Sequence, residues 1–128
     1  METLLKVFIA DDSAPVRERL AALISELETV QLVGQAENGH DAMEAVRKLR
    51  PDVVILDIRM PGGNGFQVLE EIKKTVATTV VIMLTAFPYP QYRRKCLEAG
   101  AECFFDKTTE FDRVAEALEH LMQSKSAV

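Results

Sequence analysis

The chain has 128 residues, of which 48% are hydrophobic and 27% charged, and it carries a formal net charge of −5. This size and composition predict a single globular domain over residues 1–128 and exclude a disordered chain. The acidic balance argues against sequence-independent binding to a phosphate backbone, which requires clustered Lys and Arg. No apolar run approaches the ~20 residues of a membrane span. We therefore expect neither direct nucleic-acid binding nor membrane insertion.

Two further features favour a cytoplasmic location. The N-terminal segment METLLKVFIADD is not a secretory signal, because its apolar stretch is short and ends in two acids. The two cysteines, Cys96 and Cys103, lack the spacing of a metal site. Both observations are typical of a protein that works in a reducing compartment.

Strand-like and helix-like hydrophobic patterns alternate along the chain. Short runs rich in β-branched residues predict strands at residues 4–10, 30–36, 52–56, 79–85 and 102–105. Apolar residues at helical spacing predict helices at residues 16–27, 42–49, 66–75, 91–100 and 111–122. Ser13 and Pro15 supply a cap and a first-turn proline for the first helix. Pro88 and Pro90 keep the chain non-helical until past Pro90.

Five strands and five helices in strict alternation predict an α/β fold with a parallel sheet. Right-handed crossovers place helices on both faces of such a sheet. Strands without a polar face, such as VVIL (53–56), fit burial between two helical layers. The chain is therefore expected to form three layers, with the sheet in the middle.

Chemically useful side chains fall at the carboxyl ends of four predicted strands. These ends share one edge of an open parallel sheet, and ligands bind there. The residues at this edge are Asp11 and Asp12, Asp57, Thr85, and Asp106 and Lys107. Each one alone has an ordinary explanation, such as a helix cap, a turn or a solvated lysine. Their joint position predicts a functional site.

Three neighbouring carboxylates raise one another's pKa unless a cation relieves them. Lys107 offers only one positive charge, so a hard divalent ion such as Mg²⁺ is the expected supplement. A carboxylate can act as a nucleophile and form an acyl phosphate, with nearby positive charge stabilising the phosphoryl oxygens. Neither His40 nor His120 completes a hydrolytic set, since both are expected at the surface, and no nucleotide-binding glycine motif is present.

Several motifs stand at these strand ends. Asp11 and Asp12 follow the first strand, and ILDIRMPGGNG (55–65) has the form strand-Asp-x-x-Met-Pro-Gly-x-x-Gly. LTA (84–86) contains Thr85, EAGA spans residues 98–101, and Lys107 closes the fifth strand. Through this combination the chain resembles, over essentially its whole length, the receiver domain of two-component response regulators.

The resemblance implies a flavodoxin-like three-layer sandwich with strand order 2-1-3-4-5. It implies that Asp57 is the phosphoacceptor, receiving a phosphoryl group from a phosphohistidine on a sensor histidine kinase or phosphotransfer protein. It also implies a Mg²⁺ site formed by Asp12, Asp57 and the backbone carbonyl of Arg59, with Asp11 helping directly or through water.

The same resemblance implies how a signal leaves the site. Lys107 would pair with the acids and then with the phosphoryl group. Thr85 would reorient toward a phosphoryl oxygen and draw Phe104 inward. This change would remodel the face of the fourth helix, fifth strand and fifth helix, where a downstream protein binds. The chain would then be a switch, not an enzyme, beyond assisting its own phosphorylation and dephosphorylation.

Some positions depart from the family pattern. Thr108 stands where the family usually has a proline, which affects the geometry expected for the loop after the fifth strand. Phe104 lacks the hydroxyl of a tyrosine, and a plain core aromatic is the alternative explanation of this residue. Arg59 and Phe87, two residues beyond Asp57 and Thr85, flank the phosphoryl site. We expect their bulk to shield a phosphoryl group from water.

Three alternatives remain open from the sequence. Only one helix and a short tail follow Lys107, so we expect a stand-alone receiver acting through protein contacts or as a phosphoryl relay. A receiver cut from a longer chain would have the same pattern. An unphosphorylated binding module is a second alternative. The third is an aspartate-nucleophile phosphatase, which would need an acid where this chain has Arg59.

Overall fold

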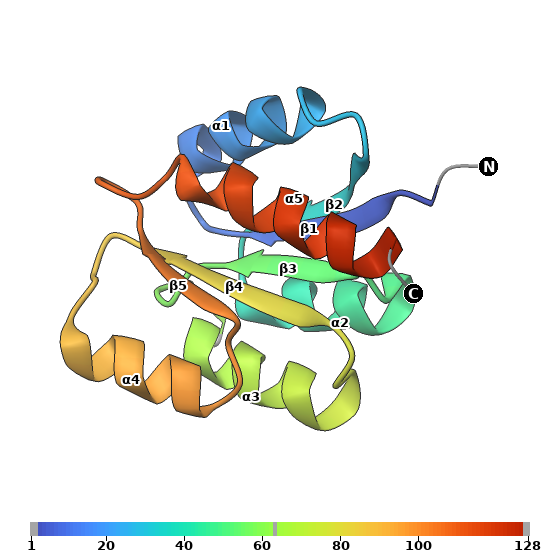
Figure 1. Ribbon diagram of the computed structural model, residues 1–128. Helices are drawn as coiled ribbons and strands as arrows, with labels where there is room; N and C mark the ends of the chain where they lie inside the picture. The colour runs from blue at the N-terminus through green and yellow to red at the C-terminus, as the bar shows by residue number, and fades with distance from the viewer. Residues whose placement is uncertain (1–2, 63, 127–128) are drawn as a thin grey trace.

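The computed structural model describes residues 3–62 and 64–126. Strands and helices alternate along them, as predicted (Figure 1). The strands are β1 (Leu5–Ala10), β2 (Val30–Ala36), β3 (Val53–Leu56), β4 (Val80–Thr85) and β5 (Cys103–Asp106). The helices are α1 (Ala14–Ser25), α2 (Gly39–Leu49), α3 (Gly65–Thr75), α4 (Pro90–Glu98) and α5 (Arg113–Ser126).

The strands form one parallel sheet in the order β2-β1-β3-β4-β5. Helices α1 and α5 cover one face, and α2, α3 and α4 cover the other (Figure 1). The central strand β3 serves both faces by strict alternation. Val53 and Ile55 pack in the cluster beneath α1 and α5, whereas Val54 and Leu56 pack in the cluster beneath α2, α3 and α4. The predicted three-layer α/β fold and its strand order are confirmed.

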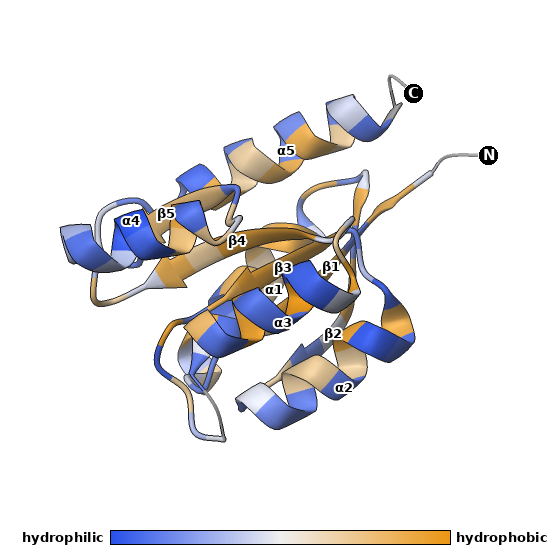
Figure 2. Ribbon diagram, turned by 90° about the horizontal axis from the view of Figure 1, so that it is seen from below, coloured by the Kyte–Doolittle hydropathy of each residue, from blue (hydrophilic) through white to orange (hydrophobic). Residues whose placement is uncertain are grey.

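Hydropathy follows the layers (Figure 2). The central strands are strongly hydrophobic, and the helices alternate between apolar and polar residues. All four residues of β3 are buried, which explains the absence of a polar face in VVIL. Among the described residues, no helix is long and apolar enough to cross a membrane.

The helix starts follow from capping chemistry. The Ser13 hydroxyl accepts a hydrogen bond from the Val16 amide, and Pro15 occupies the first turn of α1. Asn38 and Asn64 cap α2 and α3 through their side chains. These caps set the directions in which the chain leaves the site edge.

Several predicted helix boundaries differ from the structure, and two of these differences have a specific physical cause. Helix α4 begins at Pro90 itself, because proline lacks only an N–H that the first helical turn leaves unpaired anyway. Helix α5 begins at Arg113, two residues after the predicted start at Phe111. Phe111 is nevertheless buried against α5's cluster, so its apolar character reports burial in the preceding turn.

Candidate functional site

The acidic residues at the ends of β1 and β3 converge at one edge of the sheet. Asp11, Asp12 and Asp57 each offer a carboxylate oxygen, and these three oxygens lie within 4.8 Å of one another. Asp11 and Asp57 are buried, with exposed fractions of 2% and 5%, whereas Asp12 is exposed. The cluster therefore has two buried acids and one acid that faces solvent.

Lys107 joins the two buried acids. Its Nζ lies 2.7 Å from Asp11 Oδ2 and 3.0 Å from Asp57 Oδ2. Burial alone would lower the pKa of Lys107, but hydrogen bonds and charge from Asp11 and Asp57 outweigh burial and raise this pKa. The lysine is thus held as a cation between the ends of β1, β3 and β5.

The carboxyl group of Asp57 is only partly satisfied. Burial raises its pKa, Lys107 opposes that rise, and the nearby Asp11 carboxylate adds to it. Its Oδ2 pairs with Lys107, but its buried Oδ1 has no hydrogen-bond partner among the described residues. Such an unpaired buried oxygen is costly for a purely structural residue. The unpaired Oδ1 is thus available to a cation or a covalent group.

Backbone contacts fix Asp57 in this position. The Asp57 amide donates to the Ala10 carbonyl at 3.0 Å, which extends the β1–β3 pairing by one residue. After the turn, the Gly65 amide donates to the Ile58 carbonyl at 2.6 Å. A Cβ at Gly65 would lie 1.8 Å from the carbonyl oxygen of Asp57, so only glycine permits this approach. The glycine in the predicted turn motif therefore has a specific steric role.

Thr85 and Phe87 occupy the next strand end. Thr85 is fully buried, and its Oγ1 accepts a hydrogen bond from the Phe87 amide at 3.0 Å. The Phe87 ring lies under the Arg59 guanidinium, with 3.9 Å between Cζ and the ring centroid. The two positions predicted to flank the site thus contact each other.

Phe104 is a core residue in this structure. Its exposed fraction is 3%, and it packs in the cluster beneath α2, α3 and α4. Its carbonyl accepts a hydrogen bond of 3.0 Å from Arg93 of α4. The alternative explanation of Phe104, a core aromatic, describes this conformation, and an inward movement would start from a side chain that is already buried.

The loop after β5 uses the amide that Thr108 provides. The Thr108 N–H donates to Asp106 Oδ1 at 2.7 Å, a hydrogen bond that proline could not make. The described residues contain no cis peptide bond. Lys107 is anchored by its own amide, which donates to the Thr85 carbonyl at 2.8 Å. The departure at Thr108 leaves the ammonium group between Asp11 and Asp57.

Arg17 was not predicted as part of the site. Its guanidinium donates to the Asp11 carbonyl at 2.7 Å and lies 3.7 Å from a carboxylate oxygen of Glu37. Its position one turn after the Ser13 cap was the available signal, because that turn faces the end of β1. Arg17 therefore holds the backbone of Asp11, and among the described residues its ion pair is with Glu37, outside the carboxylate cluster.

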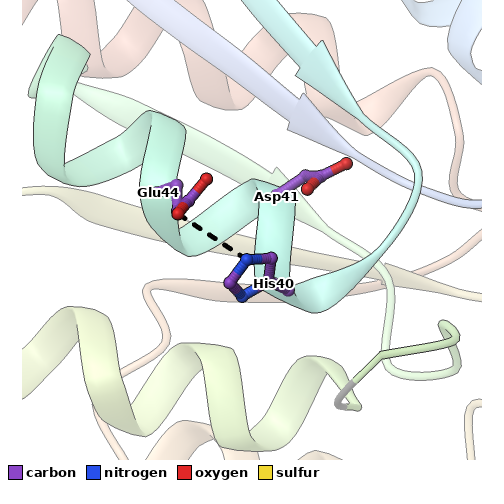
Figure 3. Close-up of side chains that lie close together, drawn as sticks. All are labelled: His40, Asp41 and Glu44. Atoms are coloured by element: carbon purple, nitrogen blue, oxygen red, sulfur yellow. Dashed lines mark ion pairs between the residues drawn. The ribbon is translucent and has the colours of Figure 1, made fainter.

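A second group of possible ligands lies apart from this site. His40, Asp41 and Glu44 occupy the beginning of α2, and all three are exposed (Figure 3). His40 Nε2 lies 3.6 Å from Glu44 Oε1, and Asp41 interacts with the capping residue Asn38. This group matches an exposed ion pair beside a helix cap. His40 is a surface residue, as predicted.

The donor set fits a hard divalent cation. Carboxylate oxygens are the ligands that Mg²⁺ prefers, and Mg²⁺ retains several waters when few protein ligands are present. Two buried acids and one exposed acid, with an unpaired oxygen on Asp57, provide such a partial set. Lys107 alone leaves the three carboxylates in excess by two charges.

The chain matches known proteins over the same region. The family model of the response regulator receiver domain matches residues 7–119. The transcriptional regulatory protein YvfU of Bacillus subtilis is 37% identical over 122 residues, covering 95% of this chain and 61% of that protein. DesR of the same organism is 33% identical and covers 95% and 60%, respectively. The chain spans less than two thirds of the length of either relative.

Solved structures give the same result. The response regulator domain of CheB from Thermotoga maritima superimposes with a TM-score of 0.83 at 32% identity, covering 98% of both chains. The receiver domain of a putative response regulator NarL from Mycobacterium tuberculosis gives a TM-score of 0.87 at 29% identity, covering 94% of this chain and 98% of that one. The chain belongs to the response regulator receiver domain family, which confirms the resemblance noted from its motifs.

Proposed function

We propose that the chain is a phosphorylation-dependent signalling switch in which Asp57 is the phosphoacceptor. The observation that carries the proposal is the carboxylate of Asp57, with one oxygen on Lys107 and the other buried without a partner. A carboxylate oxygen would attack phosphorus in a phosphohistidine of a sensor kinase or phosphotransfer protein. The phosphorus–nitrogen bond breaks, histidine leaves, and an aspartyl phosphate forms.

Positive charge around Asp57 would support this transfer. We propose that Asp11, Asp12, Asp57 and the backbone carbonyl of Arg59 hold Mg²⁺, which when bound supplies charge that offsets the phosphoryl oxygens. Lys107 already lies within hydrogen-bond distance of Asp57. Its ammonium can stay in place and pair with a phosphoryl oxygen instead of Oδ2.

The proposed switch begins at Thr85. Its hydroxyl accepts from the Phe87 amide, and turning toward a phosphoryl oxygen would break that bond. The change would pass into the β4–α4 segment and then to the face of α4, β5 and α5, the proposed binding surface for a downstream protein. Since Phe104 is already buried, we propose that it follows the repacking of α4 instead of entering the core from solvent.

We propose that residues 1–128 form one receiver domain and that this domain works in the cytoplasm. The two relatives are named as transcriptional regulatory proteins, but each extends well beyond the matched region. We propose that this chain supplies the phosphoryl-accepting switch and that its own contacts are with proteins, without direct nucleic-acid binding. Its role is that of a switch and not of a turnover enzyme.

The test is phosphorylation with a small donor. The full chain is incubated with Mg²⁺ and acetyl phosphate, and its intact mass is measured. We expect one added, alkali-labile phosphoryl group in the unmodified chain and none in Asp57→Asn. Asp112→Asn is the matched control, because Asp112 is an exposed aspartate outside the site. It should accept the group as the unmodified chain does.

Other outcomes would favour the alternatives. No adduct under any condition would support an unphosphorylated binding module. Continuous release of phosphate at enzymatic rates would support an aspartate-nucleophile phosphatase. An adduct that persists in Asp57→Asn would assign the phosphoacceptor to another residue.

A further inference from the structure

A small notch lies beside the site, between the β3–α3 turn and helix α4. Its volume is about 240 Å³. Apolar and aromatic side chains form its inner surface: Ile58, Phe66, Tyr92 and Cys96. Arg59, Asn64 and Lys95 provide its polar lining. We call this feature the α3–α4 notch. Its lining residues come from the β3–α3 segment, α3 and α4, and α3 and α4 cover the same face of the sheet as α2 (Figure 1).

The notch carries two cations that lack a carboxylate partner. Lys95 Nζ lies 4.1 Å from the centroid of the Phe66 ring, and the Arg59 guanidinium lies over Phe87. Among the described residues, neither cation forms an ion pair. The chain as a whole is acidic, with a net charge of −5, whereas the notch is locally positive because it has two cations without an acidic partner.

The other polar group of the notch is also a donor. The Oδ1 of Asn64 already accepts a hydrogen bond from the Gln67 amide at 2.9 Å. Because this capping bond occupies Oδ1, the Nδ2 amide is the group of Asn64 that can donate to a ligand. The lining residues include no Asp or Glu. The lining therefore fits an occupant with hydrogen-bond acceptors and negative charge beside an apolar body.

Size and charge together favour a side chain over a free small molecule. Pockets for small-molecule ligands are typically ~300–1,000 Å³, and the notch is smaller. The two cations of the lining, Arg59 and Lys95, also favour an occupant with more than one acid. A peptide segment with several acids can pair with both cations, whereas a single small acid cannot.

We propose that the α3–α4 notch binds a segment of a partner protein in which a large apolar side chain is flanked by Asp or Glu. The apolar side chain would occupy the notch between Phe66 and Tyr92. The acids would pair with Lys95 and Arg59. This binding uses no phosphoryl group, so it can be tested without phosphorylation of Asp57.

The experiment is a selection of short random peptides on the full chain without any phosphodonor. Selected peptides are then synthesised and titrated against the chain. We expect enrichment of an aromatic or large aliphatic residue next to Asp or Glu. Lys95→Gln should weaken the best peptide about tenfold, the effect of losing one charge-assisted contact. Replacing the peptide's apolar residue by Ser should abolish measurable binding.

Arg94→Gln is the matched control, because Arg94 is an exposed cation on α4 that does not line the notch. It should change binding by less than about twofold, as expected for an exposed charge at the rim. Equal losses in Lys95→Gln and Arg94→Gln would overturn the proposal in favour of diffuse charge attraction. Selected peptides without the acid–apolar pairing, or tight binding of a small aromatic acid alone, would also overturn it.

Discussion

The buried carboxylate of Asp57 makes the stability of this domain depend on pH. Because burial raises the folded-state pKa above the ordinary aspartate value of 3.8, the folded state holds this proton more tightly than the unfolded state. Asp57 therefore increases the free energy of unfolding at low pH, where it is protonated. This contribution is lost as pH rises from about 3.8 through the folded-state pKa.

Asp57→Asn should remove that loss. We expect the variant to gain stability relative to the unmodified chain as pH rises through this window and to be the more stable of the two at neutral pH. Lys107 keeps its 2.7 Å partner Asp11 in the variant. Urea unfolding at several pH values, without divalent cations, measures the difference. Asp112→Asn is the control, and curves for Asp57→Asn that run parallel to the unmodified chain at all pH values would contradict the expectation.

Gly65 is a second residue that the site constrains, because the structure leaves no room for a side chain there. Gly65→Ala would place a methyl group 1.8 Å from the Asp57 carbonyl oxygen, so the β3–α3 turn must shift. We expect destabilisation of roughly 1–3 kcal/mol, typical of overpacking, together with much slower phosphorylation by acetyl phosphate. Thermal unfolding and intact mass measure the two effects.

Gly34→Ala separates these two effects. A Cβ at Gly34 would lie 2.9 Å from the Phe8 ring, which also requires a shift but is not at the site edge. This variant should lose stability and still accept the phosphoryl group at the normal rate. If both glycine variants lost phosphorylation equally, the effect of Gly65 would be one of general stability.

At the scale of elements, the β4–α4 segment is restrained at Phe87, through both the backbone amide and the side chain of this residue. The Phe87 amide is held by Thr85 Oγ1, and the Phe87 ring is held by Arg59. The Thr85 hydroxyl, which accepts from Phe87, can also donate a hydrogen bond, and so can the Arg59 guanidinium; an aspartyl phosphate would attract both donors. A phosphoryl group would therefore draw on both restraints of Phe87, and we expect the paired Arg59 and Phe87 side chains to shield that group from water.

The Arg59→Ala, Phe87→Ala double variant tests this cover. With both side chains truncated, water reaches the aspartyl phosphate more easily, and we expect the phosphoryl group to be lost several-fold faster. Phosphate release from chain purified after phosphorylation gives the rate. Arg94→Ala controls for the loss of one exposed cation, and an unchanged half-life in the double variant would contradict a shielding role.

The sequence predicted the elements well where one signal dominated. β3 was predicted because VVIL has no polar face, and Ser13 was predicted as a cap because Pro15 follows it. The boundary at Phe111 was misplaced, since burial in a turn and burial on a helix produce the same apolar residue. Helix α4 was predicted to start after Pro90 but starts at Pro90 itself. Proline is tolerated in the first turn of a helix, so its effect depends on its position there.

The candidate site was predictable only in part for a similar reason. Strand ends can be located from hydrophobic pattern, so Asp11, Asp57 and Lys107 were expected at one edge. Contacts between side chains of different loops, such as Arg59 on Phe87, depend on rotamers that no periodicity reports. The same holds for the burial of Phe104.

At the scale of the whole molecule, both ends of the sheet are closed by a lysine. At the site edge, Lys107 joins Asp11 and Asp57. At the opposite end, Lys125 of α5 contacts Asp52 Oδ2 at 2.7 Å and donates to the Leu4 carbonyl at 3.1 Å. At the site edge Lys107 faces three carboxylates, whereas the Lys125–Asp52 contact is a one-to-one pair, so a divalent cation should stabilise the fold from the site edge.

Mg²⁺ should therefore raise the melting temperature of the unphosphorylated chain. A ligand that binds only the folded state at ten times its Kd stabilises by about 1.4 kcal/mol, enough to raise Tm by several degrees. Asp12→Asn should reduce this shift strongly, because it removes the exposed acid of the cluster without disturbing the buried pair around Lys107. Thermal unfolding with Mg²⁺, and with NaCl of equal ionic strength, measures the effect. Addition of EDTA should reverse it. An equal Mg²⁺ shift in Asp12→Asn and in the unmodified chain would contradict binding at this cluster. The cation would then bind elsewhere or act only by screening exposed charge, which affects both chains alike.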